Sequence, residues 1–306
     1  MATNEAKLIN NLFRDIKRVV KNNKINSLHE PYLGNNEKKI LNESIKKNEV
    51  SSVGRYRQKF EKLISEYTGV KYAVTTSSGT AALHLALKAI GVRNNHEIIV
   101  PSLNFVASVN AILYCNAIPH FVDINPNNLG IDPKALEIYL KNIALIKNNK
   151  CINKKTNKII FAVVPVYVFG NSYDIEKLKR VCKKFKLKII EDSAEALGTF
   201  YKKKHAGTFG EAGCLSFNGN KIITTGGGGA VLTNSKKIYE FVKRNIFNGK
   251  LKHDYELIYE PNSLNFRMPD INAAIGCAQI KNLNYFLSLK RNLAKRYSKF
   301  FKKNNE

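Results

Sequence analysis

From residue 71 onward, short apolar runs alternate with longer segments in which apolar residues recur every three to four positions. The apolar runs predict strands, and the periodic segments predict helices. We expect strands at 71–78, 96–102, 118–124, 159–166 and 187–194, and helices at 79–91, 105–116, 132–143 and 174–185. This alternation is typical of a mostly parallel sheet with helices on both faces. The pattern therefore predicts an α/β fold.

Three further segments depart from this alternation. Apolar residues at helical spacing, separated by charges, predict an N-terminal helix that carries Leu8, Leu12, Ile16, Val19 and Val20. Segment 144–158 has no periodicity and is rich in Lys and Asn, so we interpret it as a polar surface insertion. Over 272–301 the helical spacing returns and predicts one long helix, whose apolar residues include Ile275, Ile280, Leu283, Phe286 and Leu287.

The composition limits the class of protein. With 306 residues, 44% of them hydrophobic, the chain can bury a large core, and we expect one large domain with a smaller appendage. The net charge of +26 would favour an anionic partner. However, the lysines are scattered among Asn and Ile, and no zinc-finger, basic-zipper or RNA-binding signature accompanies them. We therefore expect no nucleic-acid partner.

The cysteines and the apolar runs bear on metal binding and on the compartment. The five cysteines lie far apart, with neither CxxC nor zinc-ligand spacing. This spacing predicts no metal site and fits a reducing compartment. No apolar run reaches about 18 residues, and the N-terminus lacks the continuous apolar centre of a secretion signal. We expect a soluble, cytoplasmic protein without a membrane span.

Candidate chemistry collects where the predicted strands end. Ligands of such sheets bind at the carboxyl ends of the strands. Ser78, Gly79 and Thr80 stand at a strand-to-helix turn, where unpaired N–H groups can bind an anion, although Thr80 is equally compatible with a simple helix cap. Glu191 and Asp192 end a buried strand, where a carboxylate either caps, forms an ion pair or faces a positive ligand nitrogen.

Lys221 lies in the segment SFNGNKIITTGGGGA, before four consecutive glycines that we expect to provide positive φ and close packing. The simplest interpretation is a solvated lysine before a tight turn. An anion site, a carboxylate and an amine at three strand ends nevertheless match the needs of pyridoxal 5′-phosphate (PLP). Its phosphate needs donors, its ring nitrogen needs an anion, and its aldehyde needs an amine for a Schiff base.

These motifs resemble those of a known family. Segment 216–230 resembles the S-F-x-x-x-K-x-x-T-T-G-x-G-G motif of the DegT/DnrJ/EryC1/StrS aminotransferases, PLP-dependent enzymes of fold type I that aminate nucleotide-linked keto sugars. The resemblance runs from about residue 29 to the end, through SSGTAALHLAL, VPSLNFVAS, EDSAEALG and LNFRMPDINAAIGCAQI. It is greatest for aminotransferases of the legionaminic-acid type of pathway, which act on UDP-linked 4-keto-6-deoxy-N-acetyl amino sugars.

The resemblance implies roles for the matching residues. Lys221 would hold the cofactor as a Schiff base and then move the proton between the substrate carbon and the cofactor. Asp192 would keep the ring nitrogen protonated. The other residues implied to bind the cofactor are Ser78, Gly79, Thr80 and Ser216 at the phosphate, Phe105 at the ring face, Ala194, and Glu195 near the ring hydroxyl.

A shared dimer site is also implied. Asn265 would reach the phosphate of the cofactor in the neighbouring subunit, which makes the protein a homodimer with shared active sites. Ser52 and Gly54 match the family's loop at the substrate entrance. Tyr167 stands where relatives usually carry histidine, and we expect it to lie near the substrate.

The implied organisation is a helical segment 1–50 that contributes to a small domain, a large PLP-binding domain 51–271, and a long helix 272–306. That helix would lead to a small domain truncated at its C-terminus, so part of its apolar face would meet water. The implied function is amino transfer from glutamate to UDP-4-keto-6-deoxy-N-acetylhexosamine in surface-polysaccharide or nonulosonic-acid biosynthesis.

Two alternatives to this function remain. One is a sugar dehydratase of the same fold, against which Lys221 argues, because those enzymes carry histidine at that position. The other is a truncated, inactive homologue that binds a cofactor or a partner.

Overall fold

The structure is a computed structural model that describes residues 4–19, 29–251, 253, 255–261 and 263–304. Residues 1–30 and 31–306 form two units, which we describe separately. In the first unit, helix α1 (Asn4–Val19) carries the exposed residues Leu8, Leu12 and Ile16, as predicted, whereas Val20 lies outside the described residues. The predicted domain boundaries at residues 50 and 271 stay predictions.

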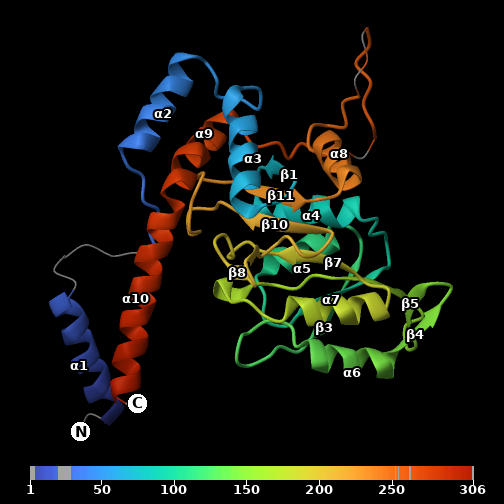
Figure 1. Cartoon of the computed structure of the whole chain (residues 1–306), viewed down its shortest axis with the longest axis horizontal. Helices are drawn as coiled ribbons and strands as arrows, with labels where there is room; N and C mark the ends of the chain where they lie inside the picture. The colour runs from blue at the N-terminus through green and yellow to red at the C-terminus, as the bar shows by residue number, and fades with distance from the viewer. Residues whose placement is uncertain (1–3, 20–28, 252, 254, 262, 305–306) are drawn as a thin grey trace. The chain divides into compact units, whose positions relative to one another are not determined.

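The second unit is built on a mixed, mostly parallel sheet (Figure 1). Its main strands lie in the order β1-β11-β10-β7-β6-β2-β3. Along this path, every neighbouring pair is parallel except the two that β11 makes with β1 and β10. The strands are β1 (Tyr72–Thr76), β2 (Glu97–Pro101), β3 (Ile118–Val122), β6 (Ile159–Val163), β7 (Lys188–Asp192), β10 (Ala212–Ser216) and β11 (Gly229–Thr233).

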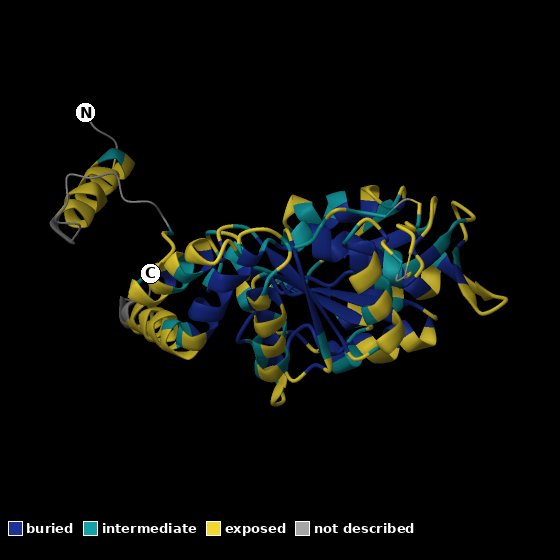
Figure 2. Cartoon of the chain, turned by 90° about the horizontal axis from the view of Figure 1, so that it is seen from above, coloured by how far each residue is buried: buried dark blue, intermediate teal, exposed yellow. Residues whose placement is uncertain are grey.

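Helices cover both faces of this sheet, as the alternating pattern predicts. Successive strand residues point to opposite faces, so Ile98 packs in one apolar cluster and Ile99 in another. One face is covered by α4 (Gly79–Ala89), α5 (Val106–Leu113) and α8 (Lys236–Asn245). The other face is covered by α6 (Pro133–Ile143) and α7 (Ile175–Lys184), and by α3 (Arg55–Thr68) with α9 (Asp270–Gln279). Figure 2 shows the buried strands running between these helices.

The segment 144–158 is largely exposed, as we interpreted it, but it is not irregular. It forms a hairpin of β4 (Ala144–Lys147) and β5 (Lys150–Asn153), and β5 adds to the sheet beside β6. The buried carboxylate of Glu97 anchors the hairpin, because it accepts hydrogen bonds from Asn153 (2.9 Å) and Thr156 (2.5 Å). A second small sheet consists of β8 (Phe200–Tyr201) and β9 (Lys204–His205).

The predicted long helix over 272–301 is interrupted. α9 ends in a 3₁₀ turn, η2 (Ile280–Asn282), and α10 (Leu283–Asn304) follows. Ile280 and Leu283 are buried in the cluster under α3, and α2 (Asn35–Lys46) packs on α9, so much of the face expected to meet water is covered. The exposed apolar residues of α10 are instead Tyr285, Leu289, Leu293 and Tyr297. None of the helices described is long and apolar enough to cross a bilayer.

Candidate active site

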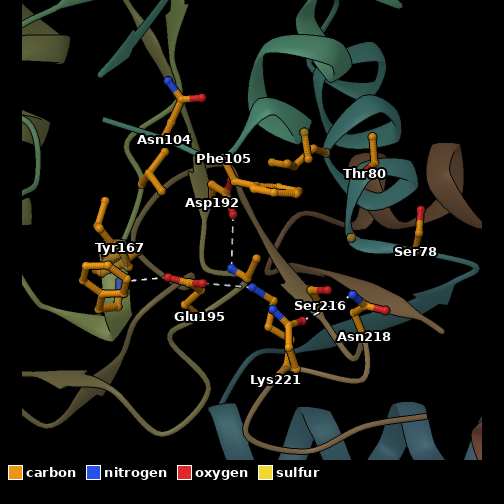
Figure 3. Close-up of a pocket in the computed structure, with 18 of the residues that line it drawn as sticks. Ser78, Thr80, Asn104, Phe105, Tyr167, Asp192, Glu195, Ser216, Asn218 and Lys221 are labelled. Atoms are coloured by element: carbon orange, nitrogen blue, oxygen red, sulfur yellow. Dashed lines mark hydrogen bonds and ion pairs between the residues drawn. The ribbon is translucent and has the colours of Figure 1, made fainter. Parts of the chain in front are cut away.

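A cavity of about 440 Å³ opens where the parallel strands of the sheet end (Figure 3). Loops that follow β1, β2, β6, β7 and β10 contribute to its wall, so residues far apart in the sequence meet there. The structure brings most of the predicted site residues together in this wall: Ser78, Gly79, Thr80, Phe105, Tyr167, Asp192, Ala194, Glu195, Ser216 and Lys221. Among the described residues, no group of His, Cys, Asp and Glu is arranged to hold a metal ion.

Lys221 is presented by a loop that closes on itself between β10 and β11. The buried Phe217 anchors this loop: its N–H donates to the carbonyl of Gly228 (2.9 Å), and its carbonyl accepts from the Thr225 N–H (2.9 Å) and the Thr224 hydroxyl (3.1 Å). The two threonines of the motif are therefore structural. They fix the loop that carries the lysine.

The Lys221 side chain is only 15% exposed, and its Nζ lies 3.0 Å from Oε1 of Glu195. The other carboxylate oxygen of Glu195 accepts the N–H of Phe169 at 2.8 Å. Figure 3 shows both interactions as dashed lines from Glu195. Lys221 is thus not the solvated surface lysine of the simplest interpretation, because its amine is held inside the cavity beside an anion.

Asp192 ends β7 with a buried carboxylate that faces the cavity. It accepts the hydroxyl of Ser108 at 2.5 Å and the N–H of Ala194 at 3.1 Å. Burial raises the pKa of Asp192, and these two hydrogen bonds, followed by the charge of Lys221, oppose that rise. A buried carboxylate with a raised pKa is a natural partner for a cationic ligand nitrogen, which would restore the stability of its charged form.

The neighbouring Glu191 has a different role. It accepts the N–H groups of Gly207 (3.0 Å), Phe209 (2.6 Å) and Gly210 (2.7 Å), and the hydroxyl of Tyr167 at 2.6 Å. Burial raises the pKa of Glu191, and these bonds oppose it. Glu191 does not line the cavity, so of these two adjacent carboxylates only Asp192 faces it.

Tyr167 contributes to the cavity wall, but its side chain is 1% exposed. Its ring packs on Tyr173 with a centroid separation of 4.6 Å, and its hydroxyl is bound to Glu191. The hydroxyl is therefore engaged away from any substrate in the cavity. A contact between Tyr167 and a substrate stays a prediction.

The N-terminus of α4 and the end of β10 meet at one end of the cavity. The Ser78 hydroxyl caps α4 by accepting the N–H of Ala81 at 3.1 Å, so Ser78, not Thr80, is the cap. A Cβ atom on Gly79 would lie 2.9 Å from Cβ of Ser216. Glycine at position 79 therefore leaves space, which any other residue would fill, for a ligand between the first-turn N–H groups of α4 and the Ser216 hydroxyl. A helix N-terminus with this geometry attracts an anion.

The glycine run after Lys221 matches its predicted roles only in part. Gly226 has a φ of +80°, whereas a Cβ atom on Gly229 would lie 2.5 Å from the carbonyl oxygen of Ser78. Positive φ and close packing are thus divided between different glycines. Phe105 lies at the start of α5 with its side chain 74% exposed, beside the same cavity.

Three predicted residues do not line the cavity of their own chain. Asn265 is exposed, in a backbone bridge to Phe247. Ser52 lies in the loop before α3, and Gly54 packs against Asp270, since a Cβ atom there would lie 2.2 Å from its carboxylate. The roles of Asn265, Ser52 and Gly54 toward a cofactor or substrate stay predictions.

Sequence reasoning missed several residues of the wall and its support. Ser108 lies one turn after Phe105 in α5, within a motif that we noted, but nothing in the motif separates it from the exposed Ser102. Polar residues Asn104, Asn218 and Asn220 also line the cavity. In a chain so rich in asparagine, no local signal marks these three.

Comparison with known proteins identifies the family of the chain. The sequence pattern described as the DegT/DnrJ/EryC1/StrS aminotransferase family matches residues 31–306. The chain is 40% identical over 272 residues to GDP-perosamine synthase of Escherichia coli O157:H7 (89% of this chain and 70% of the relative). It is 38% identical over 274 residues to that of Vibrio cholerae (88% and 69%). It is also 33% identical over 278 residues to UDP-4-amino-4,6-dideoxy-N-acetyl-beta-L-altrosamine transaminase of Helicobacter pylori (90% and 69%).

A solved structure of an aminotransferase shares the fold of this chain. Helicobacter pylori PseC, an aminotransferase involved in the biosynthesis of pseudoaminic acid, superposes with a TM-score of 0.80 at 32% identity, over 91% of this chain and 71% of that one. The chain thus spans about 70% of the length of these relatives. The fold is that of fold-type I PLP-dependent transferases, and the chain belongs to the DegT/DnrJ/EryC1/StrS family of sugar aminotransferases.

Proposed function

We propose that this protein transfers an amino group from glutamate to the 4-keto group of a nucleotide-linked 6-deoxy sugar. The observation that carries the proposal is the enclosed amine of Lys221, which shares one cavity with Asp192 and the N-terminus of α4. The reaction replaces the keto oxygen of the sugar by an amine and leaves glutamate as 2-oxoglutarate. PLP, the cofactor of this family, supplies the aldehyde that carries the amine and the ring that accepts electrons.

The residues present fit that cofactor. The space that a Cβ on Gly79 would fill suits a phosphate between the α4 N-terminus and the Ser216 hydroxyl. Asp192 offers a buried carboxylate whose charged form gains from a cationic ring nitrogen. Lys221 supplies the only kind of side chain that forms a Schiff base with an aldehyde.

Each of these side chains has a task that follows from its surroundings. Lys221 would bind the cofactor and later accept and return the proton of the reacting carbon, because its side chain lines the cavity and its amine is held there by Glu195. Glu195 lies 3.0 Å from that amine and would orient it. Asp192, held by Ser108 and Ala194, would keep a positive charge on the ring nitrogen. Phe105 would lie against the ring face.

Two sugar nucleotides compete as the acceptor. A UDP-linked 4-keto-6-deoxy-N-acetylhexosamine follows from the sequence motifs, and relatives named for a UDP-linked sugar are 33–34% identical to this chain. Relatives named GDP-perosamine synthase reach 36–40% identity, which favours a GDP-linked 4-keto sugar as the second candidate. Incubating the purified protein with PLP, glutamate and each keto sugar separates them. Amination of neither sugar would support the inactive homologue instead.

The nucleophile can be identified without any substrate. Borohydride reduction of the PLP-loaded protein should fix the cofactor to a peptide that contains Lys221, and Lys221→Ala should remove both this link and amino transfer. Lys202→Ala is the matched control, because Lys202 is an exposed lysine paired with Glu176. Labelling at a peptide without Lys221 would overturn the assignment.

We also propose a homodimer in which Asn265 reaches the neighbour's cofactor phosphate. The exposed position of Asn265, away from the cavity of its own chain, supports this role. If it is right, mixing inactive Lys221→Ala and Asn265→Ala subunits should restore part of the activity, because one composite site is then intact. A fully active monomer in sedimentation experiments would rule out a shared site.

A further inference from the structure

The turn η1 (Val168–Gly170) at the edge of the cavity holds an aromatic residue in an unfavourable conformation. Phe169 has φ 54° and ψ 21°, which is the left-handed region. A bulky side chain rarely adopts these angles, because its Cβ crowds the following carbonyl. Such strain persists where the surroundings impose it, and it collects at functional sites.

Burial does not account for this strain. The Phe169 side chain is 78% exposed, yet it lines the cavity, as does Phe105, which is 74% exposed. Two aromatic rings thus stand at the same opening with most of their surface in solvent. An exposed aromatic at a cavity mouth gains nothing for the fold of the chain, but it offers an apolar face to a ligand.

Hydrogen bonds on both sides of Phe169 impose its conformation. Its N–H donates to Oε2 of Glu195 at 2.8 Å. The following residue, Gly170, has a φ of +76° and donates its N–H to the carbonyl of Tyr167 (2.9 Å), while its own carbonyl accepts the hydroxyl of Thr199 (2.8 Å). Because the other oxygen of Glu195 lies 3.0 Å from Nζ of Lys221, one carboxylate holds both the amine and the aromatic turn.

We propose that Phe169 is a specificity-determining residue whose ring packs against the sugar of the acceptor, and that Glu195 is the positioning residue that holds this ring at the mouth. The proposal rests on the function proposed above. The C–H groups of one pyranose face carry partial positive charge and pack on the negative face of an aromatic ring. Glutamate offers no such face. Phe169 should therefore matter for the sugar and not for the amino donor.

The first test separates function from stability. Phe169→Gly removes the ring and relieves the strain, because glycine adopts positive φ freely. We expect its melting temperature to equal or exceed that of the wild type, while KM for the keto sugar rises at least tenfold. KM for glutamate, followed by release of 2-oxoglutarate, should stay within twofold. Phe169→Leu keeps apolar volume without a ring, and its KM for the keto sugar should lie between those of the wild type and Phe169→Gly.

Leu129→Gly is the matched control. Leu129 is also a bulky residue at positive φ (63°), and it does not line the cavity. Its replacement should change the melting temperature without changing either KM. An unchanged KM for the sugar in Phe169→Gly, in a protein whose wild type aminates that sugar, would overturn the contact between Phe169 and the sugar. Failure of the wild type with every sugar would instead refute the proposed function, and this contact with it.

The second test needs no catalysis. The chain contains no tryptophan, so Phe169→Trp and Phe105→Trp each place one fluorophore at the mouth. In the cofactor-free protein, adding Glu195→Ala should lower the fluorescence anisotropy of Phe169→Trp and leave that of Phe105→Trp unchanged. Glu195→Gln should restore the anisotropy, since its amide oxygen can accept the same N–H. Equal behaviour of the two reporters would show that Glu195 does not position the turn.

Discussion

Replacing Ser108 by alanine should expose how the buried carboxylate of Asp192 is kept charged. The Ser108 hydroxyl lies 2.5 Å from one oxygen of the Asp192 carboxylate, and the N–H of Ala194 donates to the other oxygen at 3.1 Å. A hydrogen bond to a charged group contributes about 1.5–3 kcal/mol, whereas one to a neutral group contributes about 1 kcal/mol. We therefore expect Ser108→Ala to cost about 1.5–3 kcal/mol at neutral pH, or about 3–6 °C in melting temperature.

The pH dependence gives this prediction a definite sign. Burial raises the pKa of Asp192 above its unfolded value, so the stability that this group contributes is full below about pH 3.9 and is lost as pH rises through the folded pKa. Loss of the Ser108 hydroxyl raises that pKa further. Ser108→Ala should therefore lose more stability than the wild type as the pH rises from acid to neutral. The difference in free energy of unfolding between the two proteins should shrink to about 1 kcal/mol at pH 4.

Urea unfolding of the cofactor-free protein at several pH values measures this gap. Ser108→Thr keeps the hydroxyl but adds a methyl group at a buried position, so it should lose stability by a similar amount at every pH and keep the pH dependence of the wild type. Ser102→Ala removes an exposed hydroxyl from the same motif and should have no effect. If Ser108→Ala showed the same free energy of unfolding as the wild type at every pH, the Ser108 hydroxyl would not support the carboxylate.

Two further predictions concern other parts of the fold. Gly79→Ala should weaken PLP binding at least tenfold in a spectroscopic titration while the protein stays folded, because the new Cβ would lie 2.9 Å from that of Ser216; unchanged affinity would place the phosphate elsewhere. Thr156→Val should cost about 1.5–3 kcal/mol at pH 7 in urea unfolding. Burial alone would raise the pKa of Glu97, but hydrogen bonds, first from Thr156, lower it below its usual value. The stability that the charged Glu97 contributes is therefore present above about pH 4.3 and is lost as the pH falls. A difference in free energy of unfolding between wild type and Thr156→Val that stayed constant down to pH 3 would contradict this assignment.

The sheet and the main polar residues of the cavity could be predicted from the sequence, because each apolar run that predicts a strand is followed by polar residues that are easy to recognise. Asp192 and Glu191 could not be told apart in this way. Strand residues alternate between faces, but β7 is buried on both, so no polarity pattern marks the side of the cavity. Only the folded chain shows that Glu191 accepts the N–H groups of the 207–210 loop.

The hairpin at 144–153 could not be predicted from the sequence for a different reason. Its two strands have only four residues each, and lysine and asparagine interrupt their apolar residues, so neither strand shows a sustained alternation or a buried run. What makes them strands is the pairing of β5 with β6 and the distant carboxylate of Glu97, both of which are tertiary contacts. The strain at Phe169 was likewise invisible, since its backbone angles are imposed by Glu195.

The order of the strands has a consequence for the time course of synthesis. β1 pairs only with β11 along the path of the main sheet, and Tyr72 lies opposite Thr233. At a translation rate of about 5–20 residues per second, the partner of β1 emerges from the ribosome roughly 10–30 s after β1 itself. During that interval the strand presents unpaired backbone groups that can join another chain. The first strand of the sheet is therefore open to pairing with another chain until the last strand of the sheet has been synthesised.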